Sequence, residues 1–159
     1  MADVQLVLAT KEYFGLIKDS GFDAILKDVG ISYELGVCSP YLNASELEQF
    51  AKSAADAGTK LFIAVDTSAA GLPAVLAGCT GLTAPVIGVP ANPPGARGSL
   101  QLHLPVLLTG IGPAGLRNAA LAACQILAVA DRSTRLSLGS HLSRHHEVPE
   151  FNIAQLEAK

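Results

Sequence analysis

The sequence lacks tryptophan, and aromatic residues make up only 5% of its 159 positions. Half of the residues are hydrophobic, so a folded core must be built mainly from Ala, Val, Leu and Ile, which suits closely packed strands and helices. At this length a single domain buries roughly 70% of its unfolded surface. The core therefore needs neither a disulfide nor a structural metal for stability.

Paired cysteines and long apolar runs are also missing. Cys38, Cys79 and Cys124 are odd in number and widely spaced, with no C-x-x-C pair. This pattern indicates reduced thiols in a cytoplasmic protein rather than a disulfide framework. Gly or Pro interrupts every segment that approaches the roughly 20 apolar residues of a membrane helix. We therefore expect a cytoplasmic protein with no membrane partner.

Basic residues are not in excess, and charge of either sign is scarce in the middle of the chain. The net charge of −3 provides no field for phosphate backbones, which argues against a nucleic-acid partner. Between Leu61 and Ala130 the only charged residues are Asp66, Arg97 and Arg117. Such a stretch is typical either of a surface buried against other copies of the chain or of an unusual small-residue core. We expect a homo-oligomer.

Short apolar runs alternate along the chain with segments whose apolar residues are spaced as in a helix. We expect strands at residues 4–9, 32–37, 61–65, 86–89 and 106–109. Helical periods follow at residues 14–29, 44–57, 73–78 and 115–131, with Asn43 as a side-chain cap and Gly21 and Gly30 as interruption and stop. The alternation predicts an α/β fold with a doubly wound, mainly parallel sheet. Ligands of such sheets bind beyond the carboxyl ends of the strands, which here are residues 10–14, 38–43, 66–73 and 90–98.

The segment after the third strand, residues 66–73, combines small residues with the start of a helix. Free N–H groups at a helix N-terminus form a natural anion site, although Thr67 and Ser68 there could simply cap the helix. Asp66 is the only acid in the nearly uncharged stretch. It is the strongest single candidate for a functional group, and it could equally cap the helix that follows.

Several motifs occur in the order and spacing of a known family. The resemblance rests on residues 30–35 followed by Cys38-Ser39, then Gly71-Leu72-Pro73, residues 85–90 and residues 118–128. Over roughly residues 4 to 131, the sequence resembles the aminoimidazole ribonucleotide carboxylase (PurE) family. The resemblance implies a three-layer, flavodoxin-like α/β domain that assembles into a homo-octamer. We place this PurE-like domain at residues 1–132, and a helical tail that packs on a neighbouring subunit at residues 133–159.

The resemblance also implies an activity: carboxyl transfer, as a carboxylase, mutase or lyase, on an aminoimidazole ribonucleotide or a related anionic heterocycle in purine biosynthesis. No metal or organic cofactor is expected. Ser39 matches the serine of the family's Ser-Ala-His-Arg motif, but Pro40, Tyr41 and Leu42 replace the other three residues. Gly71 stands where the family's Ala-Ala-His-Leu-Pro-Gly motif has its histidine.

Loss of both histidines leaves two functions open. Carboxyl transfer needs a group that exchanges a proton near neutral pH, for which imidazole is suited. The alternative is a catalytically inactive PurE-fold oligomer that binds a small anion or serves in assembly. If the chain is active, we expect Asp66, Tyr41 or His103 to handle protons. The expected substrate-binding residues are Thr10, Lys11, Ser39, Thr67, Ser68, Gly71 and Leu72.

The remaining histidines have simpler interpretations. His103 could be hydrogen-bonded in place rather than catalytic. His141, His145 and His146 have no cysteine or carboxylate at zinc-ligand spacing. We expect them on a solvated tail helix and predict no metal site.

Overall fold

The structure, a computed structural model, describes residues 2–67, 71–92 and 104–145. Within these residues, parallel strands form one five-stranded sheet with the order β2-β1-β3-β4-β5. The strands are β1 (Val4–Leu8), β2 (Tyr33–Val37), β3 (Leu61–Asp66), β4 (Val86–Pro90) and β5 (Val106–Leu108). The predicted α/β fold with a parallel sheet is confirmed, and each strand begins and ends within a residue of its expected range.

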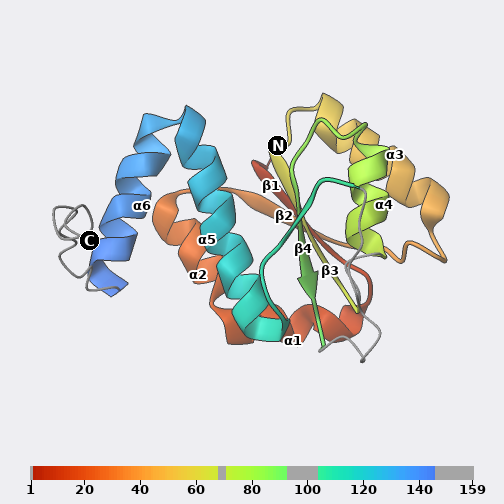
Figure 1. The fold of residues 1–159 in the computed structure, drawn as a ribbon, viewed down its shortest axis with the longest axis horizontal. Coiled ribbons are helices and arrows are strands. Elements are labelled where there is room, and N and C mark those ends of the chain that lie inside the picture. Colours follow the sequence, from red (N-terminus) through yellow and green to blue (C-terminus); the bar gives the residue numbers. More distant parts are fainter. Residues whose placement is uncertain (1, 68–70, 93–103, 146–159) are drawn as a thin grey trace, which may run out of the picture.

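Helices cover both faces of the sheet, which gives the expected three layers (Figure 1). On one face lie α1 (Phe14–Ser20), α2 (Phe22–Val29) and α5 (Gly112–Ala130), and on the other lie α3 (Ala44–Asp56) and α4 (Leu72–Cys79). A short 3-10 turn, η1 (Lys11–Tyr13), precedes α1. Gly21 separates α1 from α2 at φ +71°, a conformation that favours glycine.

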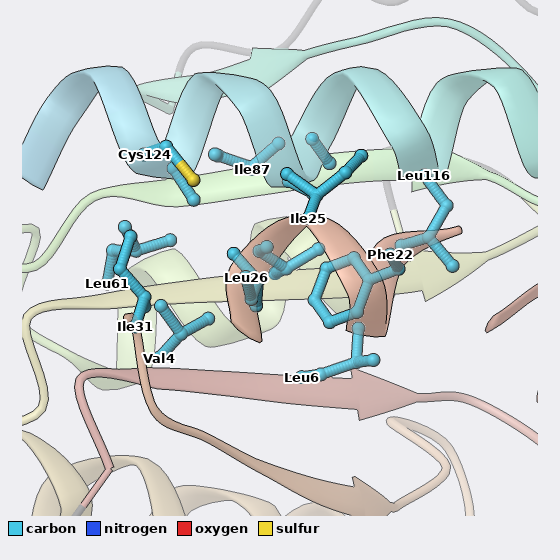
Figure 2. Close-up of a cluster of buried hydrophobic side chains, with 14 of the residues drawn as sticks. Val4, Leu6, Phe22, Ile25, Leu26, Ile31, Leu61, Ile87, Leu116 and Cys124 are labelled. Atoms are coloured by element: carbon cyan, nitrogen blue, oxygen red, sulfur yellow. The ribbon is translucent and has the colours of Figure 1, made fainter. Parts of the chain in front are cut away.

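The core follows the period-two alternation of the strands. Leu6, Ile63 and Ile87 face α2 and α5, whereas Val7 and Phe62 face α3 and α4. Figure 2 shows the first of these clusters, in which Phe22, Ile25 and Leu26 of α2 meet the sheet and Leu116 and Cys124 of α5. Because β1, β3 and β4 are buried on both faces, they are almost entirely apolar in the sequence, and Gln5 and Asp66 are the exceptions.

The last described helix, α6 (Arg132–His145), lies outside α2 and α5 of its own chain (Figure 1). Leu138 and His141 are buried there, so α6 is not the wholly solvated helix that we expected. Packing of the tail on a neighbouring subunit stays a prediction. By length and composition alone, α5 could cross a membrane, but its buried residues face the sheet, as expected of a core helix.

The entry into α3 differs from the predicted cap. Asn43 is the N-cap residue of α3, but its side chain makes no capping hydrogen bond. The chain instead arrives through a tight turn in which Ser39 Oγ accepts from the N–H groups of Tyr41 and Leu42, both at 3.3 Å. The Asn43 N–H donates to the Ser39 carbonyl at 3.0 Å. Tyr41 within this turn is exposed.

Candidate functional site

Backbone hydrogen bonds continue past the strand ends and hold the loops at the carboxyl edge side by side. The N–H of Ala9 donates to the carbonyl of Val65 at 2.9 Å, and the N–H of Ala91 donates to the carbonyl of Asp66 at 2.7 Å. On the other side of β1, the Cys38 N–H donates to the Leu8 carbonyl at 2.9 Å. The tips of β1, β2, β3 and β4 are therefore fixed relative to one another.

Asp66 is the buried acid at this edge, with 5% of its surface exposed. Its Oδ1 accepts from the Thr67 N–H at 2.6 Å and from the Thr67 hydroxyl at 3.3 Å. Its Oδ2 accepts from the N–H of Leu72, the first residue of α4, at 2.8 Å. A carboxylate with both oxygens engaged at a helix N-terminus acts as a cap. The capping interpretation of Asp66 thus has direct geometric support.

Gly71 lies against this carboxylate, and the Tyr41 hydroxyl lies beside Gly71. A Cβ atom on residue 71 would overlap Asp66 Oδ2, and it would lie 3.3 Å from the Tyr41 hydroxyl. Tyr41 is 79% exposed, so its hydroxyl lies at this edge while remaining open to solvent. The structure therefore brings together Asp66, Gly71 and Tyr41, although Tyr41 and Gly71 come from different loops.

Tyr13, at the end of η1, is not among the residues predicted from the sequence. Burial raises the pKa of its hydroxyl, and the negative charges of Asp66 and Glu12 raise it further, which places Tyr13 within electrostatic reach of Asp66. It lines a hollow with Glu12, Leu16 and Asn92. Its position directly after the first strand, in a predicted ligand loop, is the sequence signal that points to it.

The other predicted site residues differ in exposure and in their hydrogen bonds. Thr10 Oγ1 accepts from the Glu12 N–H at 3.5 Å and caps η1, while the Lys11 side chain is exposed. Leu72 is fully buried among α3 and α4 residues, so its side chain serves the core. Ser68 and His103 lie outside the described residues.

The three cysteines are free thiols, as expected. Burial raises the pKa of Cys38, to which Glu46 adds, and burial raises that of Cys79, with a further contribution from Glu48. Burial raises the pKa of Cys124 to about 11. Because the thiolate is the reactive form, these environments disfavour a cysteine nucleophile.

Comparison with known proteins matches this architecture to one family. The model of the AIR carboxylase family matches residues 16–147. The chain is 33% identical over 135 residues to an N5-carboxyaminoimidazole ribonucleotide mutase of Haemophilus influenzae, covering 80% of each protein. It is 31% identical to the mutase of Pyrococcus abyssi, covering 81% of this chain and 75% of the relative. The crystal structure of Treponema denticola PurE superposes with a TM-score of 0.70 at 20% identity, covering 89% of each chain. The chain belongs to the AIR carboxylase (PurE) family.

Proposed function

We propose that this chain binds an aminoimidazole ribonucleotide, or a related anionic heterocycle, at the carboxyl edge of the sheet and removes or adds a carboxyl group on its ring. One observation carries the proposal. Tyr41 and Gly71 occupy the two positions where the resembled motifs have histidines, and the Tyr41 hydroxyl lies beside Gly71. Family membership supplies the class of substrate.

Within the site, Tyr41 is the group best placed to move a proton. Asp66 accepts hydrogen bonds through both oxygens, so its role is to hold the turn. A tyrosine hydroxyl is a hydrogen-bond donor that can supply a proton in general acid catalysis, so Tyr41 is suited to donate a proton rather than to accept one. This favours the decarboxylating direction. The ring–carboxylate bond breaks, its electron pair stays on the ring carbon, CO₂ leaves, and the Tyr41 proton takes its place; water then reprotonates the tyrosinate.

The anionic part of the ligand requires donors at the neighbouring tips. Lys11 is exposed at the start of η1, and it supplies a positive charge next to the Thr10 hydroxyl. The exposed Thr67 hydroxyl and the Ser39 hydroxyl lie on the adjoining turns. We assign Thr10 and Lys11 to a phosphate, and Ser39 and Thr67 to the ring substituents.

A second candidate function is ligand binding without catalysis. Asp66 Oδ2 occupies the space directly over Gly71, so the site has no room for an imidazole on residue 71 while the carboxylate holds its place. A chain that has kept the turn and lost both proton carriers would still bind a small anion.

We also propose a cytoplasmic homo-octamer. Both edge strands of the described sheet expose large apolar residues: Leu35 and Val37 on β2, and Leu107 and Leu108 on β5. Exposed apolar edges invite pairing with other chains unless they are covered. Sedimentation-equilibrium analysis should give eight times the 16.4 kDa chain mass, and a monomer would contradict this assignment.

The test separates the two functions. We expect aminoimidazole ribonucleotide at a hundred times its dissociation constant to stabilise the protein by about 2.7 kcal/mol. Carboxyaminoimidazole ribonucleotide should release CO₂, and Tyr41→Phe should abolish release while keeping the thermal shift. Tyr33→Phe is the matched control, because Tyr33 is the first residue of β2 and lies at the amino end of the strand, away from the carboxyl edge of the sheet. Thermal shifts without turnover would establish the second function, and no shift with either nucleotide would overturn both.

A further inference from the structure

A second group of polar side chains lies away from the strand tips, between α2 and α6. Asp28 of α2 and two histidines of α6, His141 and His145, each offer a ligand atom, and these atoms lie within 4.8 Å of one another. The histidines are four residues apart, so they share one face of α6, and their ring centroids are 4.6 Å apart. The Nδ1 atom of His141 lies 2.5 Å from Asp28 Oδ2.

We propose that Asp28, His141 and His145 bind a divalent transition metal ion of the Zn²⁺ class, which fastens α6 to α2. Two imidazoles and one carboxylate form a common ligand set for zinc, and a histidine pair at this helical spacing is a frequent part of it. The hollow between α2, α5 and α6, lined by Gly21 and Ala24 among others, leaves space for a water as fourth ligand.

The surroundings of the cluster set the strength of this site. His141 is buried, with 5% of its surface exposed, so its ring is held in place before a metal binds. Arg144 donates to Asp28 Oδ2 at 2.5 Å, the kind of outer hydrogen bond that orients a ligating carboxylate. Arg144 and Arg117 also bring positive charge to the hollow, which opposes a cation. We therefore expect an affinity below that of a zinc finger.

The tertiary structure creates this ligand set, since Asp28 and His141 are 113 residues apart in sequence. The sequence places no carboxylate at zinc-ligand spacing from the tail histidines, so no metal site was predicted there.

The experiment uses the untagged full chain, stripped with EDTA and titrated with ZnCl₂ at pH 7.5 by calorimetry. We expect one Zn²⁺ per chain and a rise in Tm, with Co²⁺ giving the visible absorption of a tetrahedral site. His145→Ala should weaken binding at least tenfold and remove the Co²⁺ bands. His145 is exposed, so this variant should keep the wild-type Tm without metal.

Two controls make the result decisive. His146→Ala removes the histidine that follows His145 in the sequence, and Asp56→Asn removes an exposed acid on α3. We expect both variants to bind Zn²⁺ as the wild type does. Loss of binding in His146→Ala equal to that in His145→Ala would overturn the site, as would the absence of stoichiometric binding. Titration with inorganic phosphate tests the competing role of the two arginines. Phosphate binding that Arg144→Gln abolishes, in a chain that binds no Zn²⁺, would also overturn the proposal.

Discussion

Asp66 and Gly71 depend on each other: Oδ2 of Asp66 occupies the space that a Cβ atom on residue 71 would need. The same oxygen accepts the Leu72 N–H at 2.8 Å and so starts α4. The glycine in the second motif therefore has a physical reason. The carboxylate cap and a histidine side chain cannot occupy one place.

This relationship predicts a strong coupling between the two positions. We expect Gly71→Ala to lower the free energy of unfolding by about 1–3 kcal/mol, because the added methyl group displaces a buried carboxylate. Asp66→Ala alone should cost about 0.5–2 kcal/mol through loss of the cap. In the Asp66→Ala background, Gly71→Ala should cost much less. Urea denaturation of the four proteins measures the coupling, and equal penalties in both backgrounds would contradict it.

Alanine substitutions at two other glycines should change the stability of the protein in opposite directions. A Cβ atom on Gly115, near the start of α5, would overlap the backbone carbonyl of Gly110 and lie 3.2 Å from Val89 Cγ1. We expect Gly115→Ala to destabilise by about 1–3 kcal/mol. Gly139 in α6 has no atom within 4 Å of its Cβ position, so Gly139→Ala should stabilise by about 0.5–1 kcal/mol. Thermal denaturation measures the stability change of each variant. A change in the same direction for both would be inconsistent with the close approach of Gly115 to Gly110.

Asp3 makes stability dependent on pH. It accepts from the Ser32 hydroxyl at 2.7 Å and pairs with Lys60 at 2.8 Å, and so ties β1 to the starts of β2 and β3. Burial is the largest influence and raises the Asp3 pKa, but the bonds from Lys60 and Ser32 together outweigh it and lower the pKa below 3.8.

A pKa lowered by folding stabilises the folded state above the unfolded pKa, and this contribution is lost as the pH falls through the folded pKa. Asp3→Asn should therefore reduce the free energy of unfolding at pH 6 by about 1 kcal/mol. The difference from wild type should shrink at pH 3. A difference that is the same at both pH values would exclude the ionised carboxylate as its source.

The cysteines should differ in reactivity. With a pKa of about 11, Cys124 has roughly a hundredth of the thiolate of an ordinary cysteine at pH 8. It is also fully buried, whereas Cys38 and Cys79 are partly exposed. Mass spectrometry after brief alkylation should find Cys38 and Cys79 modified and Cys124 intact until urea unfolds the protein. Early modification of Cys124 would indicate that α5 opens readily from the sheet.

The positions of the strands, their mainly parallel arrangement and the family could all be predicted from the sequence. An apolar run such as residues 61–65 indicates a strand through its own composition, and a glycine such as Gly21 indicates a helix end through its backbone conformation. Both signals are local, so they can be recognised in the sequence. The resemblance also implies that Tyr41 and Gly71 stand at the family's two histidine positions, and this assignment stays a prediction.

How these positions meet depends on the packing of the folded chain. The overlap of Asp66 with the space over Gly71, the approach of Tyr41, and the charge of Asp66 on Tyr13 each depend on loops from different strands. The same holds for Asp28 and His141, which helix packing brings within 2.5 Å across 113 residues. Distances between atoms far apart along the chain are set by the packing of whole elements, and no local pattern of residues encodes them.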